Sequence, residues 1–258
     1  MGLEDYWSYE SYSLGTSGTG YVNQFSGNLT YVHDDVSLSG SRMPMSISHV
    51  YNANSQFVGT YGNQFKLNVL QKISPVDFPN TDYQYAYIDA DGTWTYFIPK
   101  EGSSSQYIDE LGKGLTLTIS GDDYVMEDKN HNKMYFNHTS HFLSKIEDTS
   151  GNTMTVSLTG SGSVPLVSSV TDGAGRTATF EYSNNKLWRI VSPDGDRTYY
   201  YYNTDGYLTE IRRFEDDGTY ISSTYFTYEN GILKGILDSE SKQGVEFRNA
   251  KVRGSYRI

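Results

Sequence analysis

The sequence contains no cysteine and only 6 prolines in 258 residues. The absence of cysteine excludes a disulfide scaffold, a zinc site with thiolate ligands and thiol catalysis. No run of 18 apolar residues occurs, so we expect no membrane-spanning helix and no membrane insertion. Basic residues are also scarce, since 20 Lys and Arg against 31 Asp and Glu give a formal net charge of −11. Such an acidic surface disfavours nucleic acids and anionic membranes as partners.

Tyrosine and glycine, by contrast, are abundant. The chain has 24 tyrosines, 11 phenylalanines, 3 tryptophans and 25 glycines. Aromatic residues favour half-buried strands and glycine favours tight turns. Residues 1–20 lack both a basic cluster and an apolar stretch, so we expect no signal peptide there. The chain is then either cytoplasmic or a piece of a longer exported protein, and the lack of cysteine favours the second.

Alternation in steps of two dominates the chain, and helical periodicity is almost absent. The β-rich runs are separated by Asp-Gly or Asn-Gly dipeptides at residues 91–92, 194–195, 205–206, 217–218 and 230–231. Such dipeptides are typical of two-residue type I′ hairpin turns, because both residues adopt positive φ. The pattern predicts an all-β fold, an antiparallel meander of hairpins that forms a curved or spiralling sheet.

Two-residue loops fix the cross-strand partners that we expect. Around Asp91-Gly92 they pair Tyr87 with Tyr96 and Tyr85 with Ile98. The same rule predicts the pairs Trp188–Tyr201, Ile190–Tyr199, Tyr202–Thr209, Tyr200–Ile211, Tyr228–Leu233 and Tyr225–Ile236.

An irregular repeat runs through the second half of the chain. Its unit reads L-x-x-I, then D, then G-[NR]-T, then an alternating strand that ends in an aromatic residue, and copies start at residues 143, 167, 187, 208 and 233. The spacing of three in L-x-x-I breaks the two-residue period of a strand. We therefore expect a β-bulge in each unit, which would let both apolar side chains face one side and would curve the sheet.

These repeats resemble the YD-repeat, or RHS-repeat, family. The resemblance rests on residues 143–156 and 169–211, and on residues 20–53, which look like the region preceding the repeats in RHS proteins. It implies two parts, a pre-repeat β region over 1–110 and a YD-repeat hairpin array over 111–258.

The resemblance also implies a role. RHS proteins are secreted or cell-surface bacterial proteins whose repeats form a β shell around a C-terminal toxic domain. The chain would then be a non-catalytic structural segment without a cofactor. Its partners would be the rest of the parent shell and the C-terminal effector domain, with a cell-surface glycan as a further candidate.

Aromatic side chains are the feature best suited to a glycan, because flat rings stack on sugar rings. The candidates are Trp7, Trp94 and Trp188 with the run Tyr199–Tyr202, and within them Trp94, Trp188, Tyr199 and Tyr201 are the expected stacking residues. Aromatics at alternating positions in hairpins are, however, usually explained by ordinary sheet packing. The sequence thus leaves a structural segment, a carbohydrate-binding module and, third, a glycosidase.

The spacing of the histidines and of the acidic residues does not match that of known metal sites. His138 and His141 are three apart, so on a strand they would point to opposite faces, and with His131 they predict polar surface residues. A calcium loop starting at Asp128 would need glycine at Lys133 and glutamate at Thr139. The acidic run 215–217 is better explained as a solvated hairpin tip.

Catalytic motifs fail as well. The run 160–162 lies in a polar loop, and a nucleophile elbow requires a strand-to-helix turn. A pair of carboxylates for glycoside hydrolysis would meet only in space, so the sequence neither predicts nor excludes one. We therefore expect no catalytic residue, no metal ligand and no cofactor site.

Overall fold

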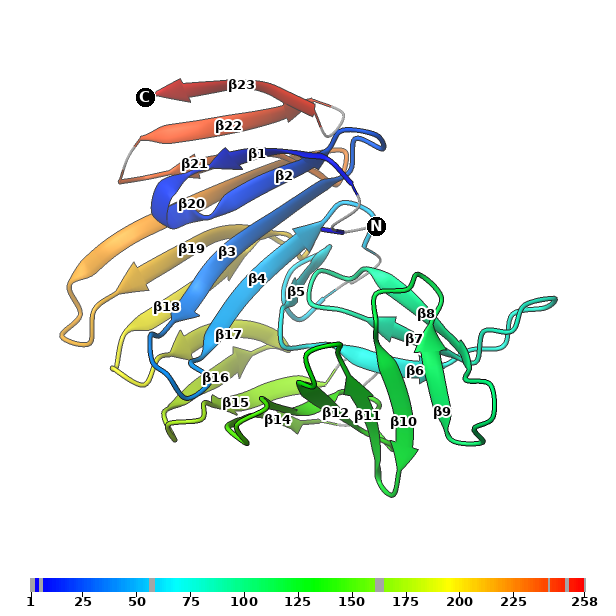
Figure 1. Ribbon diagram of the computed structural model, residues 1–258. Helices are drawn as coiled ribbons and strands as arrows, with labels where there is room; N and C mark the ends of the chain where they lie inside the picture. Colours follow the sequence, from blue (N-terminus) through cyan, green and yellow to red (C-terminus); the bar gives the residue numbers. More distant parts are fainter. Residues whose placement is uncertain are drawn as a thin grey trace.

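The computed structural model describes residues 3–4, 7–55, 59–160, 165–240, 242–248 and 251–257. They form a nearly all-β, antiparallel structure, as the sequence predicted (Figure 1). The elements are β1 (Tyr9–Ser13), the 3-10 helix η1 (Gly15–Ser17), β2 (Thr19–Asn23), β3 (Leu29–Ser37), β4 (Ser46–Asn52), β5 (Phe65–Leu67), β6 (Lys72–Pro75), β7 (Tyr85–Ile88), β8 (Trp94–Pro99), β9 (Gln106–Asp109), β10 (Thr116–Ser120), β11 (Asp123–Glu127), β12 (Lys133–Asn137), β13 (Leu143–Glu147), β14 (Thr153–Thr159), β15 (Leu166–Thr171), β16 (Thr177–Ser183), β17 (Lys186–Val191), β18 (Arg197–Tyr202), β19 (Leu208–Phe214), β20 (Tyr220–Glu229), β21 (Ile232–Asp238), β22 (Gln243–Arg248) and β23 (Lys251–Arg257). Within the described ranges, no helix is long and apolar enough to cross a membrane.

Two sheets share these strands. Strands β1 to β5 form a five-stranded sheet in chain order, and from β6 to β23 each strand pairs with the next one along the chain. The second sheet first curls on itself, because Leu143 N–H donates to Gln71 O and Ile73 N–H donates to His141 O (both 2.9 Å). Strands β14 to β22 then continue as a curved array with the five-stranded sheet lying against it (Figure 1).

The two-part division at residue 110 stays a prediction. Strands β9 and β10, on its two sides, pair with each other through Ile108 and Thr116. The five-stranded sheet ends at Leu67, and the second sheet begins at Lys72.

Most hairpin turns differ from the expected two-residue type. In the turn at Asp172, the N–H of Asp172 donates to Arg176 O and the N–H of Gly175 donates to Asp172 O, which makes a loop of three residues. Asp172 Oδ1 accepts the N–H groups of Ala174 (3.0 Å) and Arg176 (2.9 Å), and Gly175 has φ of +82°. The same backbone pattern begins at Asp89, Asp128, Asp148, Ser192, Asn203 and Glu215. This recurring loop geometry explains the D-x-x-G pattern of the repeat unit, because only the last of the three loop residues needs a positive φ.

The longer loops correct several predicted pairings. Tyr87 pairs with Thr95, not Tyr96, and Tyr85 pairs with Phe97, not Ile98. The pairs Trp188–Tyr201, Ile190–Tyr199, Tyr202–Thr209 and Tyr225–Ile236 are also wrong, because Ile190 pairs with Thr198, Tyr202 with Leu208 and Tyr225 with Leu237. The pairs Tyr200–Ile211 and Tyr228–Leu233 are confirmed. Asn230 (φ +53°) and Gly231 (φ +77°) form a true two-residue turn.

The predicted bulges are confirmed in all five units. In each one the residue after the leading apolar position has no cross-strand partner, and these residues are Ser144, Ser168, Trp188, Thr209 and Lys234. The bulge brings Leu208 and Ile211 onto the same face although they are three apart, and both are buried. Each unit therefore supplies two apolar side chains to the concave face of the array.

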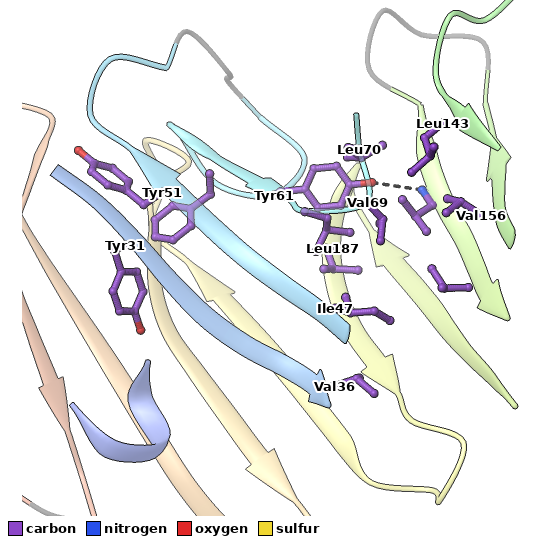
Figure 2. Packing of buried hydrophobic residues seen from close by; sticks show 14 of the residues in the cluster. Tyr31, Val36, Ile47, Tyr51, Tyr61, Val69, Leu70, Leu143, Val156 and Leu187 are labelled. Carbon is purple, nitrogen blue, oxygen red and sulfur yellow. Dashed lines mark hydrogen bonds between the residues drawn. The ribbon is translucent and has the colours of Figure 1, made fainter. Parts of the chain in front are cut away.

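The main core lies between this concave face and the five-stranded sheet. Tyr31 and Phe65 of the five-stranded sheet pack edge-on against Phe226 of β20, each with ring centroids 5.6 Å apart. Figure 2 shows residues of both sheets filling the space between them. Direct burial of aromatic and aliphatic surface thus holds the sheets together.

At four of the five bulges, the inward-facing backbone N–H of the leading apolar residue finds its acceptor in residues 51–71. The N–H of Leu233 donates to the Tyr51 hydroxyl (3.1 Å), and that of Val167 to the Tyr61 hydroxyl (3.2 Å; Figure 2). The N–H of Leu187 donates to Thr60 O (2.8 Å). A buried donor left unpaired would cost about 1–3 kcal/mol, so these contacts fit the N-terminal segment to the bulges of the array.

Replacing Tyr51 by Phe tests this fit. The Tyr51→Phe change removes one hydroxyl and leaves the buried Leu233 N–H without its acceptor, so the free energy of unfolding should fall by about 1–3 kcal/mol. Urea denaturation followed by circular dichroism measures it. Tyr225→Phe, at an exposed tyrosine of the same β20–β21 hairpin, should change it by less than about 0.5 kcal/mol. Equal effects of the two substitutions would contradict the assignment.

Candidate functional site

Three of the four predicted stacking residues lie together on the convex face of the array. Trp188 of β17 and Tyr199 of β18 pack edge-on with ring centroids 5.5 Å apart, and Tyr201 follows on the same face of β18. Trp188 is 40% exposed and Tyr201 is 37% exposed. The aromatic row continues through Phe214 of β19, whose centroid is 5.7 Å from that of Tyr199. We call Trp188, Tyr199, Tyr201 and Phe214 the convex aromatic row.

Arginines already occupy part of this row. The Arg189 guanidinium lies 4.9 Å from the Trp188 ring centroid, and the Arg212 guanidinium lies 4.7 Å from that of Tyr201. Arg212 is itself held by Glu210, to which Nε donates at 2.6 Å. Cation–π contacts of this kind stabilise a solvent-facing sheet surface and reduce the ring area open to a ligand.

The other tryptophans lie elsewhere. Trp94, 46% exposed, is on β8, where its neighbour is Tyr96 at a centroid distance of 6.2 Å. Trp7 stacks on Phe25 at 5.1 Å, next to the five-stranded sheet. Tyr200 and Tyr202 point to the opposite, concave face and are largely buried. The structure therefore brings together Trp188, Tyr199 and Tyr201, and it places Trp94 apart from them.

The histidines dismissed as metal ligands have other contacts. His138 stacks on Tyr124 at 4.7 Å, His141 meets the same ring edge-on at 5.8 Å, and His131 bonds to Glu127 at 2.6 Å. Among the described residues, no group of three His, Asp or Glu side chains is arranged to hold a metal ion. Asp128 caps a turn through the N–H groups of Asn130 and Asn132.

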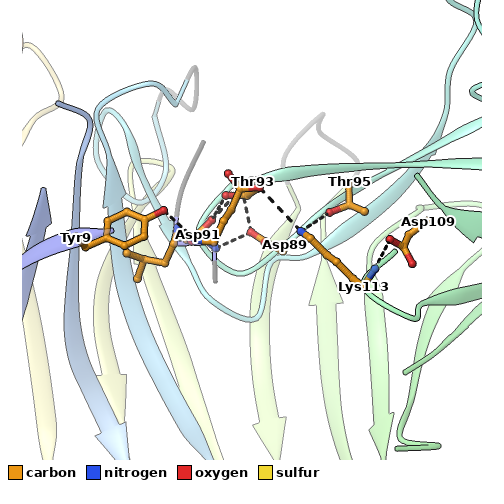
Figure 3. A network of polar contacts seen from close by, with 9 residues as sticks. Tyr9, Asp89, Asp91, Thr93, Thr95, Asp109 and Lys113 are labelled. Carbon is orange, nitrogen blue, oxygen red and sulfur yellow. Dashed lines mark hydrogen bonds and ion pairs between the residues drawn. The ribbon is translucent and has the colours of Figure 1, made fainter. Parts of the chain in front are cut away.

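A buried carboxylate pair joins the N-terminus to the β7–β8 hairpin (Figure 3). Asp89 Oδ1 accepts the N–H groups of Asp91 (3.1 Å) and Thr93 (2.9 Å), while Asp91 Oδ1 accepts the Thr93 hydroxyl (2.7 Å). Asp91 Oδ2 also accepts the Leu3 N–H. Burial and the neighbouring Asp91 raise the pKa of Asp89, and burial lowers the pKa of the nearby Lys66. These hydrogen bonds tie the turn together and link it to the N-terminal segment.

A second buried polar cluster lies between the two sheets. Asp35 of β3 accepts hydrogen bonds from Nδ1 of His33 (2.9 Å) and Nδ1 of His49 (2.5 Å), and all three side chains are at most 1% exposed. The His49 ring lies 4.5 Å from the ring of Tyr200 on the concave face of β18. We call His33, Asp35 and His49 the buried trio.

The trio holds an ionised carboxylate. Burial alone would raise the pKa of Asp35, but the charge and hydrogen bonds of His49 and His33 outweigh it and lower the pKa to about 2. Burial, Asp35 and Tyr202 raise the pKa of Tyr200, which stays a neutral phenol. Sequence reasoning missed this cluster, although an H-x-D on one strand with a histidine on the next is the signal that could have found it.

Comparisons with known proteins bear on the whole arrangement. Residues 19–97, which include β2 to β5 of the five-stranded sheet and continue into β8, match the family model described as a domain of unknown function, DUF6531. The tRNA nuclease WapA of Bacillus subtilis strain 168 is 26% identical over 148 residues, which is 57% of this chain and 6% of the relative. The tRNA3(Ser)-specific nuclease WapA of Bacillus spizizenii matches to the same extent.

A solved structure also resembles the chain. The crystal structure of TcdB2-TccC3-Cdc42 aligns with a TM-score of 0.32 and 10% identity, over 86% of this chain and 12% of that one. The chain thus spans a small part of the curated relatives that it matches. The sequence matches fit a YD/RHS-like protein.

Replacing Asp35 by Asn tests the charge of the trio. The lowered pKa of Asp35 gives stability that is present above about pH 4 and is lost as the pH falls toward 2. This stability is worth about 2 kcal/mol. The gap in unfolding free energy between wild type and Asp35→Asn should therefore narrow by about 1 kcal/mol from pH 5 to pH 3 in urea titrations. Asp34→Asn, at the exposed neighbour, should show no such narrowing, and a constant gap for Asp35→Asn would contradict an ionised Asp35.

Proposed function

We propose that this chain is a non-catalytic structural segment of a large secreted or cell-surface RHS-type bacterial protein. It forms part of a β shell that houses or displays a toxin or effector domain. The observation that carries this proposal is the fit of the five-stranded sheet against the bulged array, where tyrosine hydroxyls and one carbonyl accept the freed N–H groups. The similarity to WapA supports the same role. Those curated proteins are named nucleases, and this chain matches 6% of their length, so most of the length of each nuclease lies outside the match.

The partners follow from this role. The array continues strand by strand to β23, so further repeats of a parent protein would add to the sheet, and the effector would be held by the completed shell.

Limited proteolysis of the full-length parent protein tests the proposal. If the shell houses the effector, the C-terminal region should be cleaved at least tenfold more slowly in the full-length protein than when that region is expressed alone. Leu208→Asp places a charge in the core between the sheets and should abolish this protection. The matched control Ser168→Asp, at a half-buried bulge position outside the core, should retain it. Equal cleavage of the wild-type effector in both contexts would overturn the proposal.

Carbohydrate binding is the second candidate, favoured by the gathering of Trp188, Tyr199 and Tyr201 on one convex face. If the row binds glycans, Trp188→Ala should weaken co-sedimentation of the chain with insoluble peptidoglycan about three- to tenfold, the range expected for one stacking ring. Trp94→Ala, at a tryptophan of similar exposure on β8, should leave it unchanged. Absence of binding by the wild-type chain would remove this candidate.

A further inference from the structure

We propose that the outer face of strands β8 and β9, together with the loop before β7, is a docking surface for a basic peptide segment of a partner protein. That segment would contribute an apolar side chain next to a lysine or arginine. The proposal rests on exposed apolar side chains that lie beside carboxylates without a cation. It goes beyond the structural role proposed above and does not depend on it.

Strand alternation builds the apolar part of this surface. Along β8, Trp94, Tyr96 and Ile98 point to one side, while Phe97 points into the core. Ile98 pairs directly with Ile108 of β9, which therefore faces the same way. Trp94 is 46% exposed and Ile108 is 38% exposed. Both strands lie on the side of the molecule away from β17 to β22, so the array does not cover them (Figure 1).

The loop at residues 76–84 extends the surface. Tyr83 stacks on Tyr96 with ring centroids 4.8 Å apart, and Phe78 meets the same ring edge-on at 5.7 Å. Phe78 is itself 40% exposed. Single exposed apolar residues are common, but a contiguous group of them marks an interaction site. We call this group the β8–β9 face, and its members are Phe78, Tyr83, Trp94, Tyr96, Ile98 and Ile108.

A pocket of about 450 Å³ opens where the loop meets β8. Val76, Ile98 and Pro99 form its apolar wall, and the carboxylates of Asp77 and Asp82 also line it. The volume lies within the range of ordinary ligand pockets. A long side chain with an apolar stem and a charged head matches such a lining, because the stem packs on the wall and the head reaches the carboxylates.

The charge around the face is negative and uncompensated. Residues 73–99 contain four aspartates and no lysine or arginine. Asp77 and Asp82 are exposed, and neither makes a hydrogen bond or ion pair with the part of the chain that the structure describes. Lys100, the next basic residue along the chain, donates to Gln106 Oε1 at 3.1 Å. A partner of positive charge is therefore complementary to this surface.

A peptide fits this face better than a glycan does. Tyr83 covers one side of the Tyr96 ring and Phe78 stands edge-on to it, so these rings do not offer the open flat platform on which a sugar stacks. Ile98 and Ile108 add aliphatic surface, which suits an apolar side chain. Carboxylates that a partner covers also need a cation, because an unpaired charge is costly to desolvate. A lysine or arginine beside an apolar residue meets both requirements.

Selection from a random dodecapeptide phage library on the complete chain tests the proposal. The selected peptides should be enriched, relative to the unselected library, in lysine or arginine beside an aliphatic or aromatic residue. For the peptide selected most often, Trp94→Ala should raise the dissociation constant at least about fivefold in fluorescence anisotropy. The double change Asp77→Asn with Asp82→Asn should do the same. Its two sites lie on an exposed loop, so it keeps the test valid if Trp94→Ala folds poorly.

Matched changes on the array provide the controls. Trp188→Ala removes a tryptophan of similar exposure, and Asp216→Asn with Asp217→Asn removes the same charge from an exposed hairpin tip. Both should leave the dissociation constant within about twofold of wild type. Failure to select any peptide above background would overturn the proposal, and so would unchanged binding by the variants of the face. Binding of chito-oligosaccharides that Trp94→Ala abolishes would assign the face to a glycan and would overturn it as well.

Discussion

The structure depends on one constraint, the single unpaired residue in each repeat unit. Without it, Leu208 and Ile211, three positions apart, would face opposite sides of the sheet, and half of the apolar side chains would point to solvent. With it, both face the concave side, and the sheet bends because a bulge increases local twist. Curvature and core are therefore consequences of the same backbone irregularity. The cost, seen at four of the five bulges, is a backbone N–H that leaves the ladder and needs an acceptor outside the array.

The five-stranded sheet compensates that cost. Its tyrosines are apolar over most of their surface and carry one hydroxyl at the tip, so Tyr51 can fill the core and still accept the N–H of Leu233. Leucine in the same place would match the burial and leave the donor unpaired. This dual property of tyrosine explains how a chain so rich in tyrosine can build a core between two sheets. It also means that the N-terminal segment and the array depend on each other.

The sequence allowed much of the fold to be predicted, and the reasons for the misses are physical. Alternation placed the strands, and the L-x-x-I spacing required the bulges. The Asp-Gly dipeptide placed the turns but not their length, because a polar side chain two residues before it, such as Asp89, Ser192 or Asn203, accepts N–H groups that close a three-residue loop. One added residue shifts the register, so Tyr87 faces Thr95. The convex row was found because neighbouring strands carry it. The trio also lies on neighbouring strands, but its burial depends on β18, whose Tyr200 lies about 150 residues further along the chain.

A polar trio in an otherwise apolar interface also has a structural consequence. Two aliphatic faces can slide over each other at little cost, but a carboxylate that accepts from two imidazoles fixes one alignment of β3 with β4 and of both with β18. Buried ionic groups frequently contribute less to stability than apolar ones of the same size and more to the choice of a single packing. In this chain, the hydrogen bonds from the bulged strands to tyrosine hydroxyls fix the register at the first apolar residue of a repeat unit. The trio fixes the register at β18, which lies between those units along the chain. The same charge that selects the alignment also makes it dependent on protons.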